Sequence, residues 1–305
     1  MRRMKIDFEQ DLKTELYLAF NDYGVKIPIR KATREMLLDY LTILKKLIPI
    51  KVRKVFYAPE FEASLPNHPK KREIEYIRLL FETGKNVNFF QSKKLFQSQF
   101  HDHLLYEWNI YHFHLSLQHE KKSRFAKQTD LLLFIFIADD LVVFLGTEKH
   151  HRGIFGDDKW LQMLHDHFPE MIKEYEAKEI KDVSPQINSI ERQTLWDKGY
   201  TLGFTKIKDR VYFSPGIGRT TSAHSTLVVK TAGEIIRWLH VIHEQFISEG
   251  NAICKYLNFA PEKAEFKLRL GNITLEIAEN YSQKIVLTYN QVLDIEKISN
   301  KNSSP

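Results

Sequence analysis

Histidines gather in one part of this chain, and they set the first functional hypothesis. Nine of the thirteen histidines fall within residues 101–167. Imidazole titrates near pH 6.5, so histidine is suited to proton transfer at cellular pH. His112 and His114 are two residues apart, a spacing that places both side chains on one face of a strand. A second pair, His150 and His151, follows further along the chain.

These residue types are compatible with one specific reaction, cleavage of RNA by its own 2′-OH group. That reaction needs a base, an acid and a cation near the phosphate. His114 or His112 would act as the base and His151 as the acid. Contacts to RNA are expected from cationic and aromatic side chains: Lys149, Arg152 and Arg124 for the phosphate, and Phe155, Tyr111 and Trp108 for base stacking. Plain core packing is the alternative for Phe155, and histidines without a shared task are the alternative for the site.

An apolar hairpin between the two histidine pairs is the element expected to bring them together. Residues 131–137 and 141–145 are continuous apolar runs of strand length, and the aspartates at 139–140 suit a turn between them. If the segment that starts at Trp108 is a strand paired with this hairpin, both histidine pairs converge on one site.

The stretch from 104 to 156 resembles the core of the RelE-type bacterial ribonuclease toxins, and within them the YafQ-like branch. The resemblance rests on a W-x-x-Y motif at 108–111 followed by His114, a D-L-L-L-F strand that begins at Asp130, and a G-T pair at 146–147 leading into H-x-x-x-F from His151 to Phe155. It implies a small antiparallel sheet flanked by helices and metal-independent cleavage of mRNA, with His114, Asp130, His151 and Phe155 as functional residues. It also implies no cofactor and, as partners, RNA on the ribosome and an antitoxin protein.

Composition is compatible with such a protein. The net charge of +6 and a pI near 9.1 favour a polyanionic partner. No apolar run approaches the roughly 20 residues that span a bilayer, so we expect no membrane association. A single cysteine, Cys254, suits a reducing cytoplasm.

The apolar patterns predict an α+β protein with an antiparallel sheet core, flanking helices and a second α+β region. We expect an N-terminal domain over 1–178, a linker at 179–186, a C-terminal region over 187–298 and a disordered tail at 299–305. Helices are predicted at 33–47, 70–83, 89–100, 159–177, 190–198 and 233–257. Strands are predicted at 51–57, 104–117, 201–206, 210–214, 227–230, 265–270, 273–278 and 284–289, and a loop at 59–69.

Other motifs leave rival functions open. The glycine- and hydroxyl-rich segment 216–222 either contacts a phosphate or is a plain loop between two strands. It matches neither a Walker motif nor a dinucleotide-binding fingerprint. The rival functions are a binding module for nucleic acid or protein without catalysis, and a metal-dependent nuclease, although no H-E-x-x-H motif or cysteine pair is present.

Overall fold

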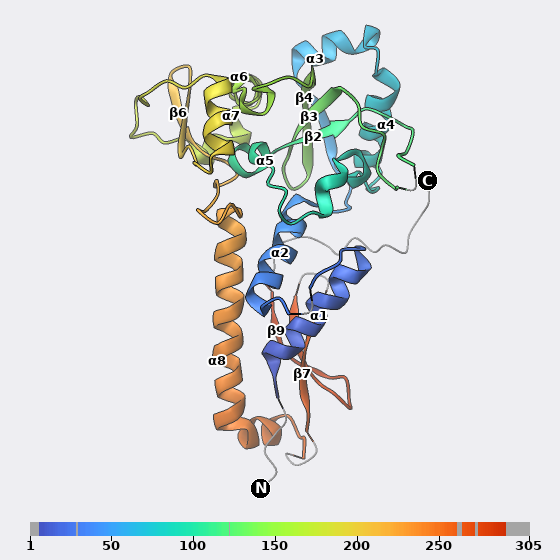
Figure 1. The fold of residues 1–305 in the computed structure, drawn as a ribbon, viewed down its shortest axis with the longest axis vertical. Coiled ribbons are helices and arrows are strands. Elements are labelled where there is room, and N and C mark those ends of the chain that lie inside the picture. The colour runs from blue at the N-terminus through green and yellow to red at the C-terminus, as the bar shows by residue number, and fades with distance from the viewer. Residues whose placement is uncertain (1–5, 29, 122, 261–263, 272–273, 291–305) are drawn as a thin grey trace. The chain divides into compact units, whose positions relative to one another are not determined.

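The chain forms two compact units, each assembled from separate stretches (Figure 1). The computed structural model describes residues 6–28, 30–121, 123–260, 264–271 and 274–290. Unit 1 comprises residues 1–49, 96–99 and 228–305, and unit 2 comprises residues 50–95 and 100–227. The linker predicted at 179–186 lies inside unit 2, so it does not coincide with the division between the units. The tail predicted at 299–305 lies outside the described residues.

A four-stranded sheet forms the centre of unit 2. Its order is β1-β4-β3-β2, from β1 (Lys54–Tyr57), β4 (Leu141–Lys149), β3 (Leu131–Ile137) and β2 (Ile110–His114). β3 pairs antiparallel with β2 and β4, while β1 adds one parallel pair at the other edge of β4. The predicted α+β class, with a largely antiparallel sheet and flanking helices, is confirmed.

Both faces of this sheet are covered, which explains why its central strands are continuously apolar. On one face, Phe113 and Phe144 each pack with their ring centroids 6.2 Å from that of Phe81 in α4 (Lys71–Glu82). On the other face, Phe134 stacks at 4.1 Å on Trp160. Figure 1 shows α4 on one side of strands β2–β4 and α6 and α7 on the other.

The second face is completed by three further elements of unit 2 besides α6 (Lys159–His167). They are α5 (His103–Trp108), α7 (Ser189–Asp197) and the hairpin of β5 (Phe204–Ile207) and β6 (Arg210–Phe213). These elements contribute Trp108, Trp196, Ile207 and Tyr212 to one buried cluster with Phe134 and Trp160.

The segment 104–117, predicted as a single strand, is instead a helix followed by a strand. Asp102 caps the N-terminus of α5, because its carboxylate accepts a hydrogen bond from the Leu105 N–H at 3.1 Å. Asn109, with φ 56°, ends the helix in the left-handed conformation that asparagine tolerates better than most residues. β2 then begins at Ile110, so Trp108 belongs to a helix, while His112 and His114 keep their places in a strand.

Two other predictions, for residues 59–69 and 89–100, are corrected. The predicted loop at 59–69 contains α3 (Pro59–Ser64) and the 3₁₀ turn η1 (Leu65–Asn67). The predicted helix at 89–100 is two 3₁₀ turns, η2 (Asn88–Phe90) and η3 (Lys93–Phe96). Here the side chains of Asn86 and Ser92 accept hydrogen bonds from backbone amides two residues ahead, which competes with helical pairing.

The helix predicted at 159–177 is shorter than expected. α6 ends at His167, and 3₁₀ turns η5 (Pro169–Met171) and η6 (Lys173–Tyr175) follow. Pro169 lacks the N–H that would continue the helical hydrogen-bond ladder, which accounts for the early end of α6. A further 3₁₀ turn, η4 (Ile154–Gly156), lies between β4 and α6.

Unit 1 is a helix and sheet assembly with its own core. Its elements are α1 (Phe8–Asp22), α2 (Thr33–Lys46), most of α8 (Thr226–Tyr256) and the meander of β7 (Phe266–Leu270), β8 (Leu275–Glu279) and β9 (Ile285–Tyr289). The strand predicted at 227–230 is wrong, since these residues are the start of α8. Asp11 and Glu15 of α1 accept hydrogen bonds from the N–H groups of Leu268 and Leu270, at 3.0 and 2.9 Å, and so satisfy the outer edge of β7. Within the described part of the chain, none of the helices combines the length and apolarity needed to cross a membrane.

Candidate active site

His112 lies in β2 on the sheet face that packs against α6. It stands opposite Phe134 in the β2–β3 register. Its Nδ1 is 3.6 Å from a carboxylate oxygen of Asp102, and both side chains are nearly buried, 11% and 12% exposed. Its ring centroid is 4.9 Å from that of Phe155. The Asp102 carboxylate therefore lies beside one nitrogen of the His112 imidazole, and the Phe155 ring lies against that imidazole. We call His112, Asp102 and Phe155, with the neighbouring His114 and His150, the histidine group.

His114 is the next residue on the same face, opposite Leu132. It is buried, and its Nδ1 lies 3.1 Å from the amide nitrogen of Thr129, which donates to it. The Thr129 hydroxyl in turn accepts from the Leu115 N–H at 3.0 Å. These contacts fix the ring at the point where the connection from β2 returns to β3.

His150, rather than His151, is the member of the second pair that faces this group. The His150 N–H donates to the Asp130 carbonyl at 2.8 Å, and its ring centroid lies 5.4 Å from that of Phe155. His151 is exposed, with its Nδ1 2.9 Å from the carbonyl oxygen of Arg152. Phe155, which lies in η4, thus contacts both His112 and His150 and joins the two strand ends.

The pKa shifts of the two β2 histidines have the same main cause. Burial lowers the pKa of His112; the Asp102 carboxylate opposes this shift and His150 adds to it. Burial also lowers the pKa of His114, to about 4, and the neighbouring His112 contributes. Both imidazoles are therefore neutral at pH 7 and are able to accept a proton.

The remaining residues predicted for the site are spread more widely. Asp130 is exposed, and it is its backbone carbonyl that binds His150. Lys149 is exposed at the end of β4, and Arg124 is exposed in the connection between β2 and β3. Trp108 and Tyr111 are buried, 1% and 8% exposed, which leaves little ring surface for the expected base stacking.

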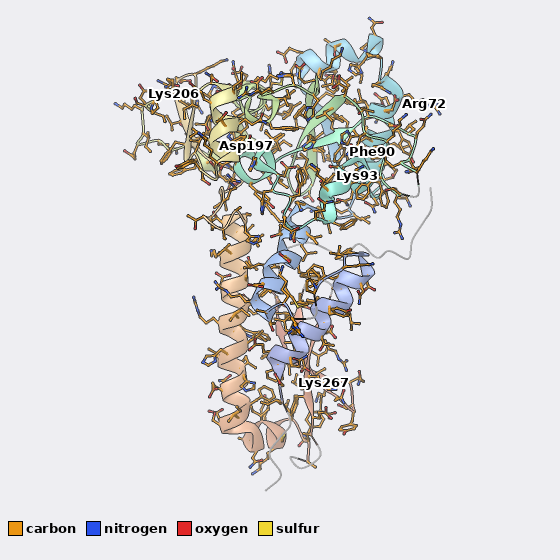
Figure 2. All side chains as sticks on the ribbon, viewed as in Figure 1. Arg72, Phe90, Lys93, Asp197, Lys206 and Lys267 are labelled. Atoms are coloured by element: carbon orange, nitrogen blue, oxygen red, sulfur yellow. The ribbon has the colours of Figure 1, made fainter. Side chains whose placement is uncertain are left out.

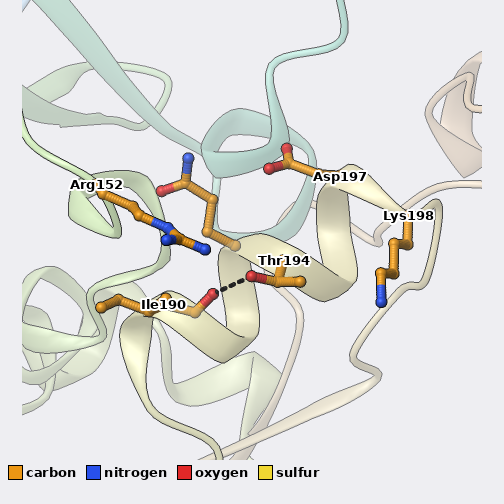
Figure 3. A pocket seen from close by; sticks show the side chains of 6 residues that line it. Arg152, Ile190, Thr194, Asp197 and Lys198 are labelled. Atoms are coloured by element: carbon orange, nitrogen blue, oxygen red, sulfur yellow. Dashed lines mark hydrogen bonds between the residues drawn. The ribbon is translucent and has the colours of Figure 1, made fainter.

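Arg152, two residues after His150 in the chain, lines a cavity together with residues of α7 (Figure 3). The cavity is held in place by Gly153, whose N–H donates to the Gln193 side-chain oxygen at 2.8 Å. Gly153 has φ +92°, and a Cβ there would lie 3.1 Å from a side-chain carbon of Ile190. A glycine therefore suits both the turn and the close approach of this segment to α7.

The glycine-rich segment 216–222 packs on the C-terminal end of α5. It joins β6 to α8 rather than two strands. The N–H groups of Gly216 and Gly218 donate to the carbonyl oxygens of Glu107 and Tyr106, at 2.9 and 2.7 Å. Those two amides are thus used within the fold and are not directed at a ligand.

A buried polar group accompanies this loop. Glu107 is 1% exposed and accepts a hydrogen bond from the Ser214 hydroxyl at 2.8 Å. Burial raises the pKa of Glu107 to about 7, against the opposing effects of Ser214 and Arg219. Arg219 is also buried, and its guanidinium donates to the Trp196 carbonyl. The group ties the loop, α5 and α7 together.

His165 and His167, two residues apart in α6, point to different partners. His165 Nδ1 lies 2.8 Å from the Tyr212 hydroxyl, whereas His167 Nε2 lies 3.1 Å from a carboxylate oxygen of Glu60. Among the residues that the structure describes, no three His, Cys, Asp or Glu side chains are grouped as metal ligands.

Asp102 and His150 are the members of the group that sequence reasoning did not assign a role. Asp102 carries an N-cap signal before α5, but nothing in its spacing points to His112. His150 was named as half of a pair, and only the strand ladder distinguishes it from His151. No family model, no curated protein and no solved structure matches the chain.

Proposed function

We propose that the chain is a metal-independent endoribonuclease of the toxin or phage-defence type, and that His112 and His150 are its proton-transfer residues. The observation that carries the proposal is the pair of ring contacts that Phe155 makes with His112 and His150, beside the Asp102 carboxylate. Cleavage by the 2′-OH requires one group that takes up a proton and another that gives one. His112 and His150 are two imidazoles close enough to contact the same Phe155 ring.

In the proposed reaction, neutral His112 takes the proton of the ribose 2′-OH as that oxygen attacks the adjacent phosphorus. His150, in its protonated form, gives a proton to the departing 5′-oxygen, so the products are a 2′,3′-cyclic phosphate and a 5′-hydroxyl. The Asp102 carboxylate stabilises the imidazolium that forms on His112. Lys149, next to His150, offers a cation to the phosphate.

The setting of this activity follows from the resemblance to RelE-type toxins. Its substrate would be mRNA in the cytoplasm, free or on the ribosome, and a protein antitoxin would hold it inactive. The sequence interpretation gave the acid role to His151; the contact of His150 with Phe155 favours His150 for it.

The experiment is a cleavage assay on single-stranded RNA in the presence of EDTA. His112→Ala should lower the rate about 10²- to 10⁴-fold, the usual contribution of a general acid or base. His150→Ala should lower it more than His151→Ala does, and His167→Ala, at a histidine bound to Glu60, is the matched control.

Three other results would contradict the proposal or favour a different function. Equal rates for His112→Ala and the parent would rule out the proposed base. RNA binding without turnover in the parent would favour a binding module with structural histidines. Activity that EDTA abolishes and Mg²⁺ restores would favour a metal-dependent nuclease.

A further inference from the structure

The cavity beside α7 lies next to the residues of the proposed reaction and contains none of its proton-transfer groups. It has a volume of about 250 Å³ and lies wholly in unit 2. Its lining comes from the turn after β4 and from one face of α7: Arg152, Ile190, Gln193, Thr194, Asp197 and Lys198. Figure 3 shows these side chains around it, with Arg152 and Lys198 at separate positions on its edge.

The lining combines three kinds of contact. Arg152 and Lys198 are exposed cations, and Ile190 is 45% exposed, an apolar surface. Gln193 uses its oxygen for the Gly153 N–H, which leaves its NH₂ group to donate. Asp197 supplies acceptor oxygens. A nucleotide site needs cations for the phosphate, an apolar surface for the face of the base, and hydrogen-bonding groups for the edge of the base. The lining supplies all three.

Charge in the cavity favours an anionic ligand. The Asp197 carboxylate lies 3.6 Å from His103 Nε2, but burial lowers the pKa of His103 to about 4, so that imidazole is neutral at pH 7. The charged groups of the lining are then two cations and one anion.

The chain connects this cavity directly to the histidine group. Residues 149–152, with sequence Lys-His-His-Arg, are consecutive and exposed where the chain leaves β4. His150 lies at the histidine group and Arg152 at the cavity, with one residue between them. Phe155 of η4 contacts His112 and His150, and η4 itself packs on α7. An RNA strand held at the histidines therefore meets the cavity within a short distance along its backbone.

We propose that this cavity binds the nucleotide adjacent to the cleaved phosphate, with Arg152 and Lys198 on backbone phosphates and Asp197 on a base amino group. The inference rests on the proposed ribonuclease function and deepens it, since it places substrate selection at α7. Carboxylates accept hydrogen bonds from exocyclic amino groups, so Asp197 would favour a base that carries one over uracil.

The test uses the full chain and a short single-stranded RNA with 2′-O-methyl groups at every ribose, which the proposed reaction is unable to cleave. Binding is measured by fluorescence anisotropy over a range of salt concentrations. Arg152→Ala and Lys198→Ala should each weaken binding about three- to tenfold. Each should also reduce the slope of log K against log salt by about 0.7, the value for one phosphate on a single strand.

Lys206→Ala is the matched control for lost charge. Lys206 belongs to β5, pairs with Asp182 at 2.9 Å, and lies apart from Asp197 in Figure 2. Its removal should leave binding and slope unchanged. Asp197→Asn, read with otherwise identical probes that carry cytosine or uracil, should reduce the preference for cytosine.

The outcomes separate this site from the proposed reaction. If Arg152→Ala and Lys198→Ala bind the probe as the parent does, or no more weakly than Lys206→Ala, the cavity is not a nucleotide site, whatever the cleavage assay shows. If the two variants weaken binding while the parent fails to cut natural RNA, the binding site stands and the ribonuclease function fails.

Discussion

Among single residues, the two histidines of β2 differ in the groups that surround them. A carboxylate oxygen of Asp102 lies 3.6 Å from Nδ1 of His112, while Nδ1 of His114 accepts a hydrogen bond from the Thr129 N–H. An imidazole that takes up a proton gains from a neighbouring anion, whereas protonation at His114 Nδ1 would displace a backbone donor. His112 is for this reason the better base of the two, and His114 the residue that fixes the end of β2.

Asp102→Asn tests this difference. Asparagine keeps an oxygen for the Leu105 N–H and caps helices as well as aspartate, so the free energy of unfolding should change by less than about 1 kcal/mol. The catalytic rate should fall about 10- to 100-fold, part of a general base contribution. Because Asp102 raises the pKa of His112, its loss lowers that pKa, and the acidic limb of the rate–pH profile should move to lower pH. An unchanged kcat and pH profile, measured with stability by urea unfolding, would remove Asp102 from the mechanism.

Among the elements, prediction from sequence succeeded where a long apolar stripe decides the structure. α2 (Thr33–Lys46) and α4 (Lys71–Glu82) lie within the predicted 33–47 and 70–83. Prediction from sequence failed where a single polar residue interrupts a segment, as Asn109 does between α5 and β2. The shared face of His112 and His114 follows from the two-residue period of a strand. The contact of His112 with Asp102 does not, because it depends on α5 turning back before β2 begins.

Gly216 provides a test of how α5 is held. A Cβ at this position would lie 2.3 Å from the Tyr106 carbonyl oxygen and 2.5 Å from that of Leu105. Gly216→Ala must therefore push the loop off α5, and we expect it to lower the free energy of unfolding by about 1–3 kcal/mol, as overpacking does. Gly203→Ala is the control, since a Cβ there meets nothing within 4 Å. Urea unfolding of both variants is the measurement, and equal midpoints would show that the loop does not depend on this approach.

For the whole molecule, the division into compact units does not follow the sequence, because each unit is built from separate stretches of the chain. The segment 179–186 has the composition of a linker, and a division there would separate α7, β5 and β6 from the four-stranded sheet. In the structure, Trp196 of α7 and Tyr212 of β6 lie in the same buried cluster as Trp108 and Trp160. Trp108 and Trp196 are in direct contact, with their ring centroids 5.5 Å apart. Sequence patterns mark where each segment is apolar but not which other segment covers it.

Three fragments, residues 50–227, 50–178 and 1–178, test which stretch completes unit 2. Fragment 50–178 lacks Trp196, Ile207 and Tyr212, and fully burying an apolar side chain contributes about 1.5–3 kcal/mol. Losing several such contributions is comparable with the roughly 5–15 kcal/mol that stabilises a typical domain. We therefore expect 50–227 to unfold in urea with a cooperative change in tryptophan fluorescence, and 50–178, which keeps Trp108 and Trp160, to show no such transition. Residues 1–178, the domain predicted from sequence, should behave like 50–178, because the same part of the cluster is missing. A cooperative transition in 50–178 or in 1–178 would mean that α7, β5 and β6 are dispensable for the sheet that carries the histidines.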